Sequence, residues 1–242
     1  MRFHQIGKRF VTTLLMREAR LVVRKYKPRV VGVTGTVGKT AAKDAIAAVL
    51  GVAYDVRKSA KSYNSEIGVP LTILGEENQW ESVRGWLRVL WHGLGLVLFR
   101  HWYPGILILE MGVDVPGDMS RLASLVSLDA AVVTALGDLP VHVSAFGTPE
   151  RLYEEKLMVG RAVKPTGTLF VNGDDARLRT SGGITYGFSD GCIVRGFDGG
   201  GGSLKAQIGG DLVPVRMPHV TGRPFAYAAL AALAVGEHFG VN

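Results

Sequence analysis

The sequence has a single cysteine, Cys192, among its 242 residues. One thiol excludes a disulfide framework and a metal site built from several cysteines, and it is typical of a protein that works in a reducing compartment. We therefore expect a cytoplasmic location. The sequence also lacks an uncharged apolar run that could span a membrane. Residues 85–99 form the strongest apolar stretch, but it carries Arg88 and His92 and is shorter than the roughly 20 residues needed. We expect an amphipathic or buried helix there, with interfacial membrane contact as the alternative.

Acidic residues are almost absent from the first 29 residues, which hold nine Lys or Arg and only Glu18. The formal net charge of the chain is +7, so this segment alone is more positive than the whole chain. Charge confined to one end indicates a basic N-terminal arm on a neutral domain, and we expect no nucleic-acid partner. The arm could face anionic lipid or an anionic substrate, or it could be a solvated helix face. Its charges also interrupt the apolar residues, so no signal peptide is expected.

The apolar pattern predicts an α/β fold. A helix is expected over residues 3–25. We expect the chain to divide into a basic N-terminal helix (1–28) and one domain (29–242). Strands and helices then alternate, which predicts a mainly parallel sheet with helices on both faces. Residues 183–217, with glycines at 199–202, predict a small antiparallel meander. The strands are expected at 29–34, 53–57, 105–110, 130–134 and 168–171, and the helices at 40–50, 117–126, 149–163 and 224–239.

A glycine loop lies between the first strand and its helix, where a phosphate-binding loop belongs. It ends in Gly38-Lys39-Thr40, and its leading glycine, Gly32, is one residue earlier than the usual spacing. Glycines allow backbone N–H groups to surround phosphate oxygens, Lys39 can neutralise them, and the Thr40 hydroxyl can reach Mg²⁺. The alternative is a glycine turn that happens to precede Lys-Thr. The expected nucleotide-binding residues of the loop are Thr34, Gly35, Thr36, Gly38, Lys39 and Thr40.

Five motifs resemble those of the Mur ligases, in the same order along the chain. The loop is similar to the ATP loop of Mur ligases and folylpolyglutamate synthetases. The other four resemble the branch that adds D-alanyl-D-alanine in cell-wall precursor synthesis. They are the segment 61–71 (KSYNSEIGVPL), Glu110-Met111-Gly112, the spacing from His142 to Lys156, and Asn172-Gly173-Asp174-Asp175.

The resemblance implies a P-loop-type central domain that binds ATP through the loop, Asn64 and Asn172. It implies two Mg²⁺ ions held by Thr40, Glu110, His142 and Lys156, with Lys156 carbamoylated by CO₂, and catalytic roles for Lys39, His142 and Lys156. In this family ATP phosphorylates a substrate carboxylate, and an amine then displaces phosphate. The implied substrates are ATP and a UDP-muramoyl-peptide, with D-alanyl-D-alanine as the amine.

The residues alone leave alternatives for three of these positions. Glu110 ends an apolar strand, where ligands bind in open parallel sheets, but it could be an exposed strand-end acid. His142 follows the 130–134 strand by one loop, but a lone histidine is more often structural. Lys156 lies among Glu150, Arg151, Glu154 and Glu155, which also fits a solvated charged face.

The chain departs from the family in ways that keep other functions open. Only 31 residues precede Gly32, so we expect no UDP-binding domain there, and we expect closure over the nucleotide to need a partner domain or chain. Pro224 and Phe225 stand where the family has His-Asn, which puts its adenine contact in doubt. The alternatives are a folylpolyglutamate- or cyanophycin-type ligase, and a non-catalytic nucleotide-binding module that acts with a partner chain.

Overall fold

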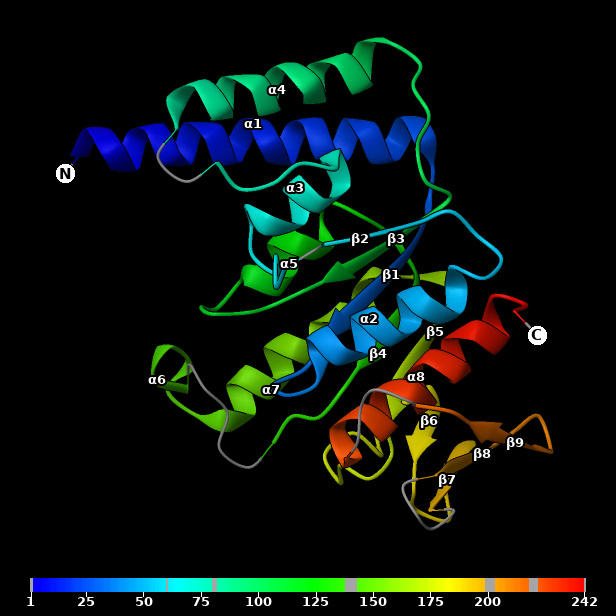
Figure 1. Ribbon diagram of the computed structural model, residues 1–242. Coiled ribbons are helices and arrows are strands. Elements are labelled where there is room, and N and C mark those ends of the chain that lie inside the picture. Colours follow the sequence, from blue (N-terminus) through cyan, green and yellow to red (C-terminus); the bar gives the residue numbers. More distant parts are fainter. Residues whose placement is uncertain are drawn as a thin grey trace.

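A computed structural model describes residues 2–59, 61–79, 82–137, 143–198, 203–217 and 222–241, with side chains from residue 9 onward. The first half of the chain alternates helices and strands, as the sequence predicts (Figure 1). Its elements are α1 (Arg2–Tyr26), β1 (Arg29–Thr34), α2 (Lys39–Leu50), β2 (Val56–Lys58), α3 (Gly68–Leu74), α4 (Val83–Leu98), β3 (Ile106–Glu110), α5 (Asp118–Ala123) and β4 (Leu128–Val133).

The second half adds two short α-helices, a 3₁₀ helix, the strands β5 to β9 and a long final helix. Its elements are α6 (Val143–Phe146), α7 (Pro149–Leu157), the 3₁₀ helix Met158–Ala162, β5 (Val163–Asn172), β6 (Ile184–Gly187), β7 (Val194–Asp198), β8 (Leu204–Ile208), β9 (Asp211–Val215) and α8 (Arg223–His238). The predicted strands and helices are confirmed within a few residues. The largest shift is at β5, which begins at Val163 instead of residue 168. β2 begins later than predicted because residues 51–54 extend α2 as a turn.

The described strands form one sheet in the order β2-β3-β1-β4-β5-β6-β7-β8-β9. The pairs from β2 to β7 are parallel, and β7-β8-β9 are antiparallel. The α/β class and the C-terminal antiparallel strands are thus confirmed, although the meander begins at β7 and not at residue 183. The difference arises because β6 is reached from β5 by a crossover of turns (residues 173–183), which leaves it parallel to its neighbour.

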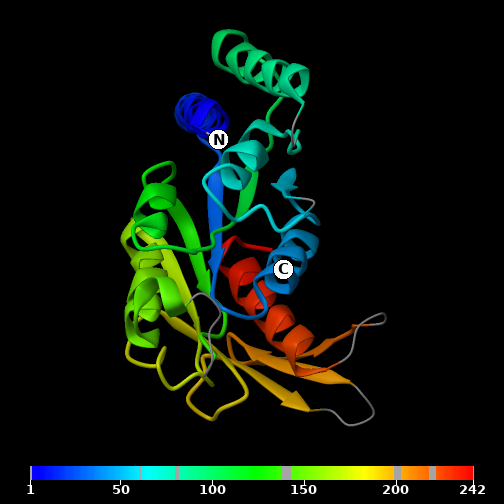
Figure 2. The same cartoon turned by 90° about the vertical axis from the view of Figure 1, so that its left-hand side faces the viewer.

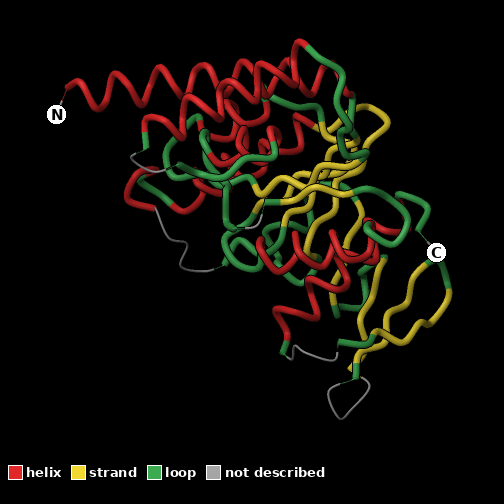
Figure 3. The backbone as a smooth tube through the Cα atoms, turned by 45° about the horizontal axis from the view of Figure 1, so that its top comes forward, coloured by secondary structure: helices red, strands yellow, loops and turns green. Residues whose placement is uncertain are grey.

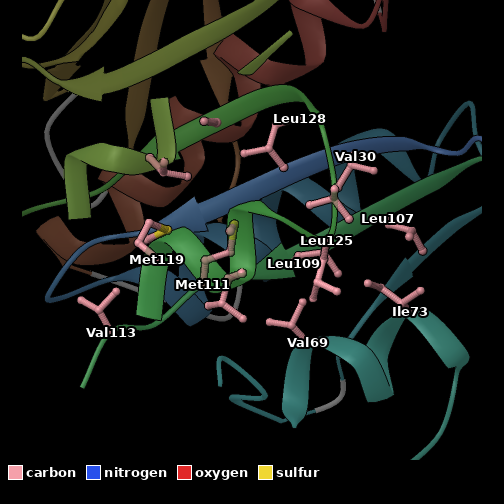
Figure 4. Close-up of a cluster of buried hydrophobic side chains, with 14 of the residues drawn as sticks. Val30, Val69, Ile73, Leu107, Leu109, Met111, Val113, Met119, Leu125 and Leu128 are labelled. Atoms are coloured by element: carbon pink, nitrogen blue, oxygen red, sulfur yellow. The ribbon is translucent and has the colours of Figure 1, made fainter. Parts of the chain in front are cut away.

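Helices cover both faces of the sheet (Figure 2). Alternate residues of each central strand enter different cores, as the pleat requires. Val31 and Val33 pack with α2 and α8 on one face, whereas Val30 packs with α1, α3 and α5 on the other. Figure 4 shows the second core, to which β1, β3 and β4 contribute Val30, Leu107 and Leu128 and α3 contributes Val69.

Helices α1 and α4 form an outer pair on this second face (Figures 1 and 3). Leu15, Ala19 and Val22 of α1 are fully buried. The Lys25 ammonium donates hydrogen bonds to the Leu96 and Val97 carbonyls at 2.8 and 3.0 Å, which satisfies the free carbonyls at the end of α4. The division of the chain into 1–28 and 29–242 stays a prediction.

Candidate active site

The predicted phosphate loop lies at the carboxyl edge of the sheet, between β1 and α2. Gly35 and Gly38 have φ angles of 137° and 87°, which glycine adopts without strain. A Cβ atom at Gly35 would lie 2.0 Å from the Thr134 hydroxyl oxygen. At Gly38 the nearest atom to an added Cβ would be 3.9 Å away, so the loop is tight on one side and open on the other.

Residues that follow β4 hold the loop in place. The Thr36 N–H donates to the Ala135 carbonyl at 2.7 Å. The Thr134 hydroxyl is 2.7 Å from the Val37 carbonyl and 3.1 Å from that of Thr34. The loop conformation is therefore fixed by its neighbour strand before any phosphate binds.

Lys39 lies over the loop, as its predicted role requires. Its ammonium donates to the carbonyls of Gly35 (3.1 Å) and Thr36 (3.3 Å). Burial lowers the pKa of Lys39, and the carboxylates of Glu110 and Asp114 oppose this effect. A cation held this way is placed to neutralise phosphate charge at the mouth of the loop.

Glu110 faces the start of α2 and is only 2% exposed, so the alternative of an exposed strand-end acid is wrong. Its carboxylate accepts a hydrogen bond from the Thr40 hydroxyl at 3.1 Å, and the Ser62 hydroxyl lies 3.2 Å from the same Thr40 oxygen. Oxygen donors of these types are the ligands that Mg²⁺ prefers. Thr40 and Glu110 therefore fit a magnesium site beside the loop.

Lys156 lies on α7 and is 5% exposed, so the alternative of a solvated charged face is wrong for this residue. Its ammonium donates to the Gly35 carbonyl at 3.2 Å, which brings it to the same loop as Lys39. Burial, and to a smaller extent repulsion from Lys39, lower the pKa of Lys156 to about 8, against the attraction of Asp114.

The remaining predicted residues differ in what the structure says of them. His142 lies outside the described residues. Asn64 lies beside the site, where its main-chain carbonyl accepts a hydrogen bond from the Gly112 N–H at 2.7 Å. Asn172 is 4% exposed, and its side-chain oxygen accepts the Asp174 N–H at 3.0 Å. Within the part of the chain that the structure describes, no three His, Cys, Asp or Glu side chains group as a metal site.

Two hydroxyl groups of the loop are buried without a hydrogen-bond partner among the described residues. They belong to Thr34 and Thr36. A buried polar atom is normally paired, because leaving it unpaired costs about 1–3 kcal/mol. These atoms therefore indicate a loop built to bind a polar ligand.

A mostly apolar pocket of about 180 Å³ adjoins the loop on the α8 side. Its wall combines the open side of the loop with Asn172, Tyr186 and the start of α8. Tyr227 of this wall is held by a 2.7 Å hydrogen bond to the Asp174 carboxylate. A flat heteroaromatic group fits such a surface in size and polarity. The lining residues are Val37, Gly38, Ala42, Thr134, Ala135, Asn172, Tyr186, Arg223, Pro224, Tyr227 and Ala228.

The family model of the Mur ligase middle domain matches residues 100–236, which is more than half of the chain. The chain belongs to the Mur ligase middle-domain family. Its relatives include UDP-N-acetylmuramoyl-tripeptide–D-alanyl-D-alanine ligases. The one from Bacillus subtilis is 29% identical over 238 residues, which cover 95% of this chain and 45% of the relative. The one from Escherichia coli is 26% identical over 165 residues, or 68% of this chain and 31% of the relative.

A solved structure with the same fold is the MurF ligase of Thermotoga maritima in complex with ADP. The TM-score is 0.76 at 25% identity, with 96% of this chain and 50% of that one covered. A pseudomurein peptide ligase of Methanothermus fervidus shares the fold with a TM-score of 0.66 at 17% identity. The chain spans about half the length of the relatives that it matches.

Three residues of this Mur-family site were missed by sequence reasoning. Asp114 acts on the pKa of both lysines, Ser62 contacts Thr40, and Thr134 anchors the loop. Ser62 lies within the 61–71 motif and Asp114 follows Glu110-Met111-Gly112, so both have a sequence signal nearby. Thr134 carries no local signal, because its role depends on strand pairing between β1 and β4.

Proposed function

We propose that this chain is the nucleotide-binding core of an ATP-dependent amide ligase that joins D-alanyl-D-alanine to a UDP-muramoyl-tripeptide. The observation that carries the proposal is the gathering of Lys39, Thr40, Glu110 and Lys156 around one glycine loop in a member of the Mur ligase family. The activity is that named for the full-length relatives.

The loop residues would bind the phosphates of ATP. The open side of Gly38 admits phosphate oxygens, Lys39 turns from its two carbonyl partners to the phosphates, and Thr36 gains a partner for its hydroxyl. Thr40 and Glu110 would hold Mg²⁺, which neutralises developing charge on the phosphates when bound. His142 and a second Mg²⁺ belong to the same proposal.

The environment of Lys156 supports carbamoylation. Only the neutral amine attacks CO₂, and a pKa of about 8 gives far more neutral amine near pH 7 than an ordinary lysine has. The nitrogen bonds to the carbon of CO₂ and loses a proton, which leaves an anion in place of the ammonium. The change converts the repulsion between Lys39 and Lys156 into attraction and supplies a further oxygen ligand for metal.

The substrates would occupy two separate cavities. The apolar pocket beside Tyr227 and Asn172 would take the purine, with Arg223 at its edge. A larger cleft, of about 640 Å³, lies between α1 and the segments around Glu66 and Gly112. This cleft would take part of the muramoyl-peptide, and Arg9 in its wall suits a carboxylate group.

The reaction would proceed by acyl phosphate. A carboxylate oxygen of the muramoyl-peptide attacks the γ-phosphorus and ADP leaves; the amine nitrogen then attacks the acyl carbon, loses a proton, and phosphate leaves. Lys39 would stabilise the charge on the transferred group. A cytoplasmic location, and closure by a partner domain or chain, are part of the proposal.

The experiment combines the chain with ATP, Mg²⁺, UDP-muramoyl-tripeptide and D-alanyl-D-alanine, and follows ADP and the pentapeptide product by mass spectrometry. We expect ADP release that depends on the muramoyl-peptide, and little pentapeptide from this chain alone, since alignment of both substrates can be worth roughly 7–11 kcal/mol. ATP turnover unaffected by the muramoyl-peptide would contradict the substrate assignment. No turnover, with nucleotide still bound, would favour the non-catalytic module.

A further inference from the structure

The outer helix α4 carries an exposed apolar stripe along its whole length. Leu87, Trp91, Leu94 and Leu98 follow each other at steps of three and four residues, so their side chains share one face. Each is between 38% and 77% exposed, although α4 buries Val89 and Leu96 on its opposite face. The stripe continues past the helix end onto Phe99 and Trp102.

The stripe is not the face that α4 uses for packing. α4 packs against α1, and it forms the outermost layer of this side of the molecule in two perpendicular views (Figures 1 and 2). Contiguous apolar surface of this kind is rare on a protein exposed only to water, and it marks a binding surface.

Positive charge lies beside the stripe and past its end. Arg84 and Arg88 are exposed on α4 at helical positions that flank Leu87 and Trp91, and exposed Arg100 follows the helix. The sequence has no Asp or Glu from residue 82 to residue 109. α1, which packs against α4, adds exposed Arg17 and Arg24.

We propose that the α4 surface (Leu87, Trp91, Leu94, Leu98, Phe99 and Trp102, with Arg84, Arg88 and Arg100) binds the surface of an anionic lipid bilayer. Apolar side chains enter the boundary between headgroups and acyl chains, tryptophans lie at headgroup level, and arginines contact lipid phosphates. The helix would lie in the plane of the membrane. No helix among the described residues is long and apolar enough to cross one.

The charge of the surroundings favours this occupant over a second copy of the chain. Two copies that met through this stripe would bring the arginines of both α4 helices together without an acidic partner in residues 82–109. Like charges at an interface oppose association, whereas anionic lipid pairs with all of them. The proposal does not depend on the ligase function, because it concerns a surface distant in the chain from the loop residues.

The test is flotation of the full chain with vesicles of phosphatidylcholine alone, or with roughly one-third phosphatidylglycerol. We expect binding to the anionic vesicles that weakens in high salt, and little binding to the neutral ones. Arg84→Glu with Arg88→Glu should weaken binding at least roughly fivefold for each arginine. Leu87→Ser, Trp91→Ser and Leu98→Ser together should abolish it.

The matched control is Val52→Ser, Ile193→Ser and Leu212→Ser, which removes exposed apolar side chains from other surfaces and should leave binding unchanged. Circular dichroism and thermal unfolding confirm that each variant is folded. Equal binding by the α4 and control variants, or no binding by the natural sequence, overturns the proposal. If the natural chain does not bind vesicles but forms oligomers in light scattering, and only the α4 serine variant loses them, the surface binds a second copy instead.

Discussion

Lys156→Met should stabilise the protein at neutral pH. Lys156 is buried beside Lys39, and its pKa falls from 10.5 to about 8 in the folded chain. One pKa unit corresponds to about 1.4 kcal/mol, so the charged lysine costs at most about 3.5 kcal/mol of stability. Loss of the hydrogen bond to the Gly35 carbonyl offsets about 1 kcal/mol of this. The net gain at pH 7 is about 2 kcal/mol, or a rise in Tm of roughly 4–8 °C for a chain of this size.

The pH dependence of the stability difference tests whether the buried charge of Lys156 is its cause. Below pH 8 Lys156 is charged in both states, and the full cost is present. Between pH 8 and 10.5 the folded chain loses its proton before the unfolded chain does, so the natural protein gains stability relative to the methionine variant. The advantage of Lys156→Met should therefore shrink to almost nothing by about pH 10.

The assay is urea unfolding of both proteins in CO₂-free buffer across this pH range, without nucleotide or metal. The exposed Lys205 gives a control, since Lys205→Met should change stability little at any pH. A methionine variant that is less stable at pH 7, or equally favoured at both ends of the range, would refute a buried, repelled lysine at position 156.

Three further predictions concern the loop and its surroundings. Gly35→Ala should destabilise the protein by more than about 2 kcal/mol in urea unfolding, since its Cβ would clash with Thr134. Gly95→Ala, which has open space around it in α4, should stabilise the protein by up to about 1 kcal/mol. Similar effects of the two substitutions would contradict the close contact between Gly35 and Thr134. Glu110→Gln should remove most of the gain in ATP affinity that Mg²⁺ gives, as measured by calorimetry with and without the metal, and an unchanged gain would place the magnesium elsewhere. Tyr227→Phe should weaken adenosine binding several-fold by freeing the ring from Asp174, and equal affinity would exclude the apolar pocket as the purine site.

Local sequence signals predicted the parts of the site that depend on neighbouring residues. The apolar run before Gly35 and the alanine-rich helix after Thr40 fix the strand, the loop and the helix in order. The run of apolar residues before Glu110 likewise places that carboxylate at a strand end. These features follow from periodicity and glycine content, which are properties of a short window.

Long-range pairing decided what the sequence could not predict. The charges around Lys156 are typical of a solvated helix, yet contact between α7 and the loop buries this one lysine. The anchoring of the loop by Thr134 and the packing of α4 on α1 likewise join segments that are distant in sequence. No local pattern specifies such partners.

The central claim, that the loop from Gly35 to Thr40 binds nucleotide phosphate, is tested most directly by titration calorimetry with Mg-ATP. Lys39→Ala should bind Mg-ATP roughly 10- to 150-fold more weakly than the natural chain, because it loses a charged hydrogen bond to phosphate. Lys205→Ala should bind it equally well. Equal affinity of the natural chain and Lys39→Ala would show that the phosphates bind elsewhere and would contradict the account.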